Sequence, residues 1–392
     1  MTNEIYIDYL PGLIRAARLV DEKLEDVLVI RSDKPQVVGN QYVGRIVGID
    51  KGVGAAFVDI GLSQSGFLPL QDIPKSLGGQ SLSEGTFLCV EGVREAFDGK
   101  GVRLKARLHE NIPAKVQVLK TLDRLGEWIL QQKEPIEFIE VTDAGIAQKI
   151  KCYLGKRGSD LISIKHSAER PDLFDVVGIE EQIEHLLETE IPLPSGGNLL
   201  IEQGRTLTAI DVNKGSMQHN GGAEALHYQL NLEAADEIAR QLKLRNIAGR
   251  IVIDFPYMKS PEHRKKLQAT FKSLLKADRV GHKLLPLYMT GLQELTRKRA
   301  GLSLQDLLLR PVGIGGLGHE KDPAIVGLEG MRRFWAESMR NRQIGSSIVA
   351  SRKVVQSLSG CDALPYIEEK IGKKISLSVD PELSADDRVV FE

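Results

Sequence analysis

The fold of this chain is decided by two short segments, Leu207-Thr208-Ala209-Ile210-Asp211-Val212-Asn213 and Arg250-Ile251-Val252-Ile253-Asp254-Phe255. Each is a β-rich apolar run that carries a carboxylate where a buried strand normally carries none. Because strand side chains alternate between two faces, Asp211 and Asn213 share one face of the first strand. Asp254 lies on the same face of the second strand as Arg250 and Val252.

The stretch between the two segments predicts a helix over residues 224–243. Its apolar side chains recur at four-residue steps, as in a helix with one buried stripe: Leu226, Leu230, Ala234, Ile238 and Leu242. A strand–helix–strand crossover lays its two strands in one sheet. The two Asp side chains are therefore expected to converge at one rim of that sheet.

Converging carboxylates indicate a metal site. Mg²⁺ takes one or two protein carboxylates together with water and phosphate oxygens, and such a site hydrolyses phosphodiesters. We predict Asp211 and Asp254 as metal ligands and catalytic residues, Asn213 as a supporting oxygen donor, and Mg²⁺ as the cofactor, with Mn²⁺ as a substitute. Either Asp alone would more simply cap a turn or pair with an Arg, but two of them beside an Asn favour the metal.

The composition is that of an ordinary globular protein. The chain has 392 residues, which suggests two to four domains, and 42% of them are hydrophobic. No apolar run approaches the ~18 residues of a membrane span, and the first residues lack the pattern of a signal peptide. We therefore expect a cytoplasmic protein with no membrane partner. Cys89, Cys152 and Cys361 are isolated, which predicts a reducing compartment and no zinc site.

Basic residues are concentrated after the second segment. The formal net charge is only −1, but residues 259–299 contain eleven Lys or Arg against three acids. Positive charge beside a metal site is what a phosphate backbone requires. The alternative is a pair of solvated helix faces whose lysines serve solubility.

A glycine-punctuated section upstream predicts a small barrel. Five short strands are expected, in the pattern of an OB-type barrel: 42–49, 55–60, 66–70, 87–93 and 102–107. Phe57 and Phe67 fall on the more polar faces of their strands, and exposed aromatic rings on a barrel stack on bases. The alternative is that the curvature of the barrel turns both rings into its core.

The segments around the barrel predict a mixed α/β unit. Residues 4–31 have the pattern of antiparallel strands. After the barrel we expect a helix over 112–131, strands at 136–139 and 161–164, and a helix over 179–189. Residues 4–31 cannot bury a core alone, so the barrel is expected to be inserted in this unit. A boundary rich in Pro and Gly follows at 192–197.

Downstream of Asp254, Ser260-Pro261 predicts the start of a helix, with Ser as the N-cap and Pro in the first turn. A second basic helix is predicted over residues 291–301. Residues 313–318 are rich in glycine and predict a flexible linker, because no strand precedes them as a dinucleotide fingerprint requires. A helix over 330–341 and an αββ-like unit over 363–391 complete the chain.

Several of these segments together resemble the ribonuclease E/G family. Asp211-Val212-Asn213, residues 231–242 and Ile251-Val252-Ile253-Asp254-Phe255 resemble its catalytic core. Residues 55–61 and 66–70 resemble its OB-fold. The resemblance covers most of residues 1–310 and is most specific over residues 192–255.

The resemblance implies an endoribonuclease that cuts single-stranded RNA and leaves a 5′-phosphate and a 3′-hydroxyl. It implies an α/β (mixed α+β) fold in which an RNase H-like domain (1–36 and 108–190) is interrupted by an OB-fold RNA-binding barrel (37–107). A DNase I-like catalytic domain (191–310) and a linker with a small C-terminal α/β unit (311–392) follow. Asp211 and Asp254 fall on the magnesium pair of the family and Asn213 on its supporting amide, and the positions that grip RNA are Phe57, Phe67 and Lys100.

The chain also departs from the family pattern. The Cys-Pro-x-Cys run that shares zinc between protomers would lie near residues 309–318, where the glycine segment stands instead. Any homo-oligomer is therefore expected to use another interface. The Arg-Thr pair that senses RNA 5′ ends has no counterpart in residues 108–190. Met289-Thr290 replaces a usual Arg-Phe, and Lys214 replaces a small residue.

Two other functions remain open from the sequence. The same fold could serve an RNA-binding or scaffold protein with little or no hydrolytic activity, which the missing zinc run and 5′-end sensor favour. A DNA phosphodiesterase is the third interpretation. Incubation of labelled single-stranded RNA with magnesium or with EDTA separates these alternatives.

Overall fold

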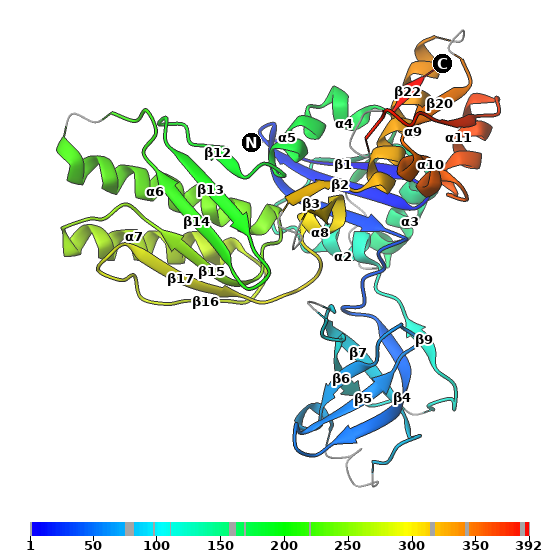
Figure 1. Cartoon of the computed structure of the whole chain (residues 1–392), viewed down its shortest axis with the longest axis horizontal. Coiled ribbons are helices and arrows are strands. Elements are labelled where there is room, and N and C mark those ends of the chain that lie inside the picture. Colours follow the sequence, from blue (N-terminus) through cyan, green and yellow to red (C-terminus); the bar gives the residue numbers. More distant parts are fainter. Residues whose placement is uncertain are drawn as a thin grey trace.

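The computed structural model describes residues 2–74, 82–96, 99–109, 111–156, 162–167, 170–218, 221–313, 318–341, 345–384 and 389–391. In these ranges the chain is a mixed α/β protein with several sheets. One of them, formed by β4 to β9 and called here the closed sheet, lies below the rest of the molecule in Figure 1. None of the helices in the same ranges is both long and apolar enough to cross a membrane.

The N-terminal sheet has the order β11-β10-β1-β2-β3. Its strands are β1 (Asn3–Leu10), β2 (Leu13–Val20), β3 (Lys23–Arg31), β10 (Phe138–Val141) and β11 (Ser163–His166). Ile5 and Ile7 pack against α2 (Arg124–Leu130) and α3 (Ala144–Gly155) on one face. Tyr6 and Leu10 alternate with them and join a second core that includes α4 (Leu173–Val176) and α5 (Ile179–His185).

The closed sheet lies between β3 and β10 in the sequence. Its strands are β4 (Gln41–Asp50), β5 (Ala55–Asp59), β6 (Gly66–Pro69), β7 (Phe87–Arg94) and β8 (Arg103–Arg107). They pair in the ring β4-β5-β6-β8-β7-β4, and β9 (Gln117–Lys120) pairs with β4 as a sixth strand. All five strands that the sequence predicts here are present.

The third sheet, called here the carboxylate sheet, has the order β12-β13-β14-β15-β17-β16. Its strands are β12 (Glu190–Pro192), β13 (Asn198–Gln203), β14 (Thr208–Asn213), β15 (Gly249–Asp254), β16 (His282–Leu284) and β17 (Leu292–Arg297). Two helices, α6 (Gly222–Leu244) and α7 (Pro261–Leu274), cover one face, where Ile210 and Ile253 pack against Leu230 and Phe271. The predicted N-cap of α7 is confirmed, since the Ser260 side chain accepts a hydrogen bond from the His263 N–H.

The C-terminal segments pack on the N-terminal sheet rather than forming a core of their own. They comprise α8 (Leu304–Leu308), β18 (Leu309–Val312), β19 (Gly318–Lys321), α9 (Pro323–Arg340), β20 (Ser347–Ala350), α10 (Arg352–Leu358), α11 (Ala363–Ile371), β21 (Ser376–Val379) and β22 (Val390–Phe391). One hydrophobic core contains Tyr6 and Leu24 together with Phe334 and Val389. Both ends of the described chain therefore contribute to the same core.

Two predicted helices are wrong. Within residues 112–131, β9 pairs with β4, and helix α2 begins only after Asp123, whose side chain caps the Gly126 N–H. Residues 291–301 contain strand β17, because Gln293, Leu295 and Arg297 alternate with more exposed neighbours and β17 pairs with β15. A helix needs side chains at steps of three and four to share a face, which this alternation does not provide.

Several further elements differ from expectation. Helices α3 and α10 were not predicted, and α9 begins at Pro323, seven residues before the predicted start at 330. The predicted αββ-like unit over 363–391 is present as α11, β21 and β22, and its two strands pair on either side of β20. The predicted linker at 313–318 joins the paired strands β18 and β19, and its residues 314–317 lie outside the described ranges.

Candidate active site

The two predicted carboxylates lie side by side. Strands β14 and β15 are parallel neighbours, and Asp211 is the register partner of Asp254. Register partners on adjacent parallel strands point to the same face, with the strands about 4.8 Å apart. Ile210, Val212, Ile251 and Ile253 are buried under α6 and α7, so the two carboxylates point to the opposite face. There Asp211 is half-buried and Asp254 is exposed.

Asn213 completes the predicted group. Its Nδ2 donates a hydrogen bond of 2.8 Å to Oδ2 of Asp211. The amide therefore restricts the rotamer of the Asp211 carboxylate and leaves its own oxygen available. The structure thus brings Asp211, Asp254 and Asn213 together on one open face, as the alternation of the two segments predicts.

Glu224, a residue of α6 that the sequence did not single out, binds the loop that follows β15 and the start of α7. Its carboxylate accepts hydrogen bonds from the Lys259 N–H (2.8 Å), the Ser260 N–H (3.1 Å) and Nδ1 of His263 (2.8 Å). The backbone hydrogen bond from Lys259, with those from Ser260 and His263, lowers the pKa of Glu224. The start of α6 is thereby attached to the start of α7, just beyond Asp254.

The loop before β17 closes on the same end of β15. Gly291 has φ +103°, and a Cβ atom there would lie 2.1 Å from the Phe255 carbonyl oxygen, so only glycine fits. Tyr288 and Tyr257 lie on the two loops that meet at this end of β15, with 47% and 50% of their surfaces exposed. Exposed aromatic rings are surfaces on which bases stack. Sequence reasoning missed both because they lie in loops without periodicity.

The predicted RNA-gripping residues lie on the closed sheet. Phe57 and Phe67 are register partners on β5 and β6, with ring centroids 6.2 Å apart in an edge-to-face arrangement. Phe57 is 37% exposed and Phe67 is half-buried, and neither belongs to the core of the closed sheet. Lys100 is exposed and lines a cavity shared with the carboxylate sheet, which neither ring lines. The position of the rings favours the outward-facing interpretation over the core alternative.

The basic residues of α7 are not beside the carboxylates. This helix packs on the buried face of the carboxylate sheet, so Lys265, Lys266 and Lys272 are exposed on the other side from Asp211. Within α7 the alternative of a solvated basic helix face therefore fits better. On the open face a cation comes from a strand instead: Arg250 of β15.

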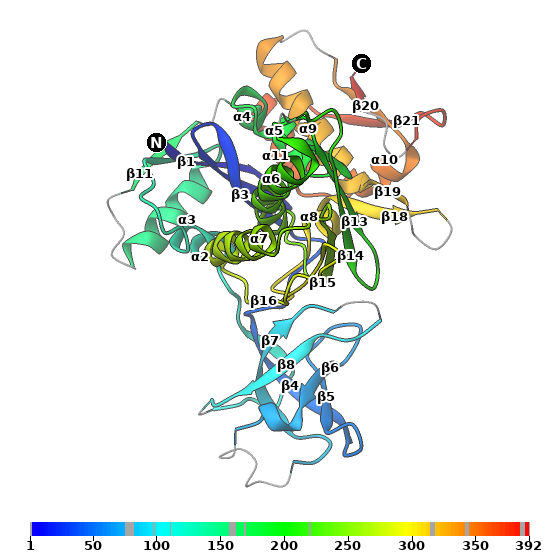
Figure 2. The ribbon, with the colours of Figure 1, turned by 90° about the vertical axis from the view of Figure 1, so that its left-hand side faces the viewer.

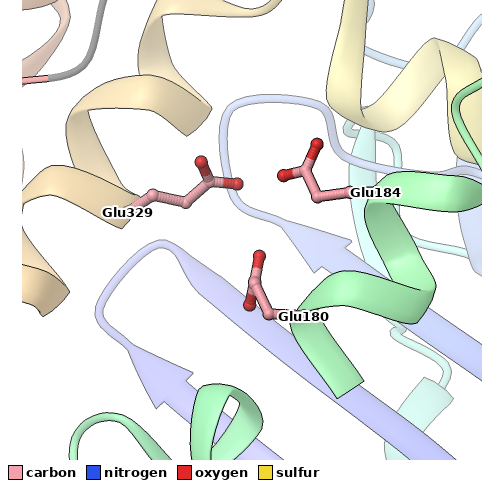
Figure 3. A group of neighbouring side chains, drawn as sticks. All are labelled: Glu180, Glu184 and Glu329. Carbon is pink, nitrogen blue, oxygen red and sulfur yellow. The ribbon is translucent and has the colours of Figure 1, made fainter. Parts of the chain in front are cut away.

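Another acidic cluster lies in a different part of the molecule. Glu180, Glu184 and Glu329 converge between α5 and α9, with ligand oxygens within 4.8 Å of one another (Figure 3). Side chains of the protein already neutralise them, because Lys321 pairs with Glu184 and Glu329, and Arg15 pairs with Glu180. Burial raises the pKa of Glu329. For Glu180 burial acts in the same direction, but the charge and hydrogen bond of Arg15, together with the charges of Arg332 and Lys321, lower the pKa overall. The cluster connects α9 to α5.

A pair of carboxylates on an open sheet face, with Arg250 on the same face, offers the oxygen donors that a divalent ion uses in phosphodiester hydrolysis. Comparison with known proteins agrees. The profile of the Ribonuclease E/G family matches residues 103–300. The chain therefore belongs to the ribonuclease E/G family, which makes it an endoribonuclease.

Individual relatives show how far the similarity extends. The chain is 25% identical to "Ribonuclease G" of Escherichia coli (strain K12) over 480 aligned residues, covering 97% of this chain and 98% of the relative. It is 36% identical to "Ribonuclease E" of Synechocystis sp. over 217 residues, which is 54% of this chain and 32% of that relative. Since the alignment with Ribonuclease G is longer than the 392 residues of this chain, that relative contains segments that this chain lacks.

Proposed function

We propose that this endoribonuclease is magnesium-dependent and hydrolyses phosphodiester bonds of single-stranded RNA, leaving a 5′-phosphate and a 3′-hydroxyl. The observation that carries the proposal is the register pairing of Asp211 with Asp254 on an open sheet face. Family membership adds that the chemistry acts on RNA. Mn²⁺ is proposed as a substitute for Mg²⁺.

The residues present fit a hard divalent cation. Asp211 and Asp254 offer carboxylate oxygens from neighbouring strands, and Asn213 holds Asp211 through its Nδ2. Such a donor set leaves room for water and phosphate oxygens, as Mg²⁺ requires. When bound, the ion would neutralise the charge that develops on the phosphate during hydrolysis. The protein contributes the fixed position of the two carboxylates and the open face on which a strand can lie.

We further propose the domain assignment that the family implies. The N-terminal sheet with α2 and α3 would be the RNase H-like domain, the closed sheet the OB-fold, and the carboxylate sheet the DNase I-like catalytic domain. In this proposal Phe57, Phe67 and Lys100 hold the RNA strand. A cytoplasmic location, and a homo-oligomer held without zinc, belong to the same proposal.

The test uses the full-length chain and a 5′-labelled single-stranded RNA. We expect cleavage with Mg²⁺ and none with EDTA. Asp254→Asn and Asp211→Asn should each lower kcat/KM by more than about a hundredfold, because a metal site loses one of its two charged ligands. Both variants should retain RNA affinity, measured by fluorescence anisotropy, since the closed sheet is unchanged. Asp236→Asn, on the outer part of α6, is the matched control.

Cleavage that persists in both variants would refute the metal assignment. A wild-type chain that binds RNA but never cuts it, with either Mg²⁺ or Mn²⁺, would favour the scaffold alternative. Equal cleavage of a DNA strand of the same sequence would contradict the RNA specificity. End-group analysis of the products checks the 5′-phosphate and 3′-hydroxyl.

A further inference from the structure

A cavity of about 270 Å³ lies between the closed sheet and the carboxylate sheet. Figure 2 shows the closed sheet below β15 and β16, so that segments far apart in the sequence meet there. Within the described ranges, four of the six lining residues are cationic and none is acidic: Arg94, Lys100, Thr206, Gly249, Arg250 and Arg299. The two sheets therefore share a strongly positive cavity.

Three of these cations have no carboxylate partner among the described residues. Among the described residues, Arg94, Lys100 and Arg250 form no ion pair, and the buried Nε of Arg94 has no hydrogen-bond partner. Burial lowers the pKa of Arg299, the charge of Arg94 adds to this effect, and Asp306 opposes it. The Asp306 carboxylate already accepts hydrogen bonds from the backbone and side chain of Ser303. An anion entering the cavity would relieve the repulsion between the cations.

Arg299 lies against the start of β15. Gly249 has φ +98°, a conformation that favours glycine, and a Cβ atom at this position would lie 2.8 Å from Nη2 of Arg299. The guanidinium therefore lies close to the backbone that precedes Arg250. A guanidinium presents several N–H donors in one plane, which suits a phosphate group.

The cavity is aligned with the carboxylates. Arg250 and Asp254 lie on the same face of β15, four residues apart, which corresponds to about 13 Å along the strand. The repeat of a nucleic acid strand is about 3.4 Å per nucleotide when stacked and up to about twice that when stretched. The cavity thus lies about two to four nucleotides from the carboxylate pair.

We propose that Arg94, Arg250 and Arg299, together with Lys100, bind one internal phosphodiester of the RNA substrate. This site lies about two to four nucleotides from the bond that is cut. The proposal rests on the proposed function, because it assigns a second contact of the same substrate. In this proposal, residues of the closed sheet and of the carboxylate sheet bind the same phosphate. That contact determines which bond of the RNA strand lies at the carboxylates.

Binding is measured first, without metal. A fluorescent single-stranded RNA is titrated with the full-length chain in EDTA at several salt concentrations. Arg250→Gln should weaken binding at least about tenfold, because a hydrogen bond to a charged group is lost. It should also reduce the slope of log K against log salt by about one, as expected for one lost phosphate contact. Lys272→Gln, which removes an exposed cation from α7, is the matched control and should change neither value.

Cleavage then locates the phosphate. A set of RNAs carries a single uncharged 2′-deoxy methylphosphonate linkage at successive positions, each compared with a 2′-deoxy phosphodiester at the same position. For the wild type, one position two to four nucleotides from the cut should lower kcat/KM by about tenfold. For Arg250→Gln the same linkage should cause no further loss, because its partner is already gone.

The outcomes separate the two proposals. The phosphate site is refuted if no methylphosphonate position lowers kcat/KM. It is also refuted if the linkage lowers kcat/KM in Arg250→Gln as much as it does in the wild type. Either result would leave the endoribonuclease activity intact. A dependence on the 5′-terminal phosphate alone would also refute it, since the site is assigned to an internal linkage. If the all-phosphate RNA is never cut, the proposed function fails, and the EDTA titration still tests the cavity. An unchanged salt slope in Arg250→Gln would then overturn the phosphate site as well.

Discussion

At the scale of single residues, Glu224 helps to fix the backbone near the two carboxylates. The loops that follow β14 and β15 lead into α6 and α7, and they must do so without covering Asp211 or Asp254. Glu224 accepts hydrogen bonds from the backbone N–H groups of Lys259 and Ser260 and from Nδ1 of His263, so its carboxylate attaches the first turn of α6 to the loop before α7 and to the start of α7. Buried or clustered N–H groups at a helix start need such an acceptor.

Glu224→Gln should make stability less dependent on pH. The folded state lowers the pKa of Glu224, so its ionised form stabilises the protein above the unfolded pKa of about 4.3, and this contribution is lost as the pH falls through the folded pKa. The urea midpoint of the variant should lie below that of the wild type at pH 7, and the difference should shrink only as the pH falls below about 4.3 and through the folded pKa. Glu262→Gln, at an exposed position of α7, is the control. A difference that stays constant as the pH is lowered below about 4.3 would contradict this role.

Arg94 and Arg299 illustrate what a sequence cannot provide at the residue scale. Asp211 and Asp254 were predictable because each interrupts an apolar strand, and the crossover rule makes their strands neighbours. Arg94 and Arg299 interrupt no such pattern. They meet only because the closed sheet lies below the carboxylate sheet, and no local signal encodes that contact.

At the scale of elements, alternation was reliable where both faces of a strand differ. Strands β3 and β8 show this alternation of buried and more exposed side chains. Strands β1 and β2 are instead buried on both faces. Strand β17 was mistaken for a helix because Arg297, Lys298 and Arg299 suggested a basic surface. In fact Arg297 is buried and pairs with Asp278, so a charged residue occupies an interior position. Tertiary pairing with β15 decided the structure of this segment.

Phe57→Ala and Phe67→Ala test the aromatic pair on β5 and β6. Each should weaken binding of a short single-stranded RNA by about 1–3 kcal/mol, because a base loses its stacking partner. Anisotropy titrations in EDTA measure this loss without cleavage. The fold should persist, since neither ring is part of the core of the closed sheet.

Val58→Ala is the contrasting control for this pair. Its side chain is fully buried in the core, so the variant should lose stability rather than affinity. If Phe57→Ala and Phe67→Ala instead unfold the closed sheet, as measured by circular dichroism, the rings belong to the core.

At the scale of the whole molecule, a buried charge network joins the two ends of the chain. Asp8 on β1 is 1% exposed and pairs with Arg15 at 2.7 Å and with Arg332 of α9 at 3.0 Å. Arg15 also reaches Glu180 of α5. Helix α9 is therefore attached to the N-terminal sheet by ion pairs as well as by the apolar core.

Asp8→Ala should destabilise the protein by about 3–5 kcal/mol, because the buried guanidinium of Arg332 loses the carboxylate it pairs with and Arg15 keeps only Glu180. Urea unfolding followed by tryptophan fluorescence measures the loss, since Trp335 lies in the affected core. Asp33→Ala is the matched control: Asp33 also pairs with a buried Arg, but its side chain is 54% exposed and Arg31 keeps Asp322. That variant should lose less than about 1 kcal/mol. Equal losses would contradict a special role for Asp8.

The shared core has a consequence for synthesis. Strands β1 to β3 emerge from the ribosome well before Phe334 and Val389, which help to cover one of their faces. Until those residues are made, the nascent chain carries an uncovered apolar surface that favours aggregation or chaperone binding. A messenger truncated before the codons for α9 would yield a product whose carboxylate sheet is complete but whose N-terminal sheet keeps an exposed apolar face.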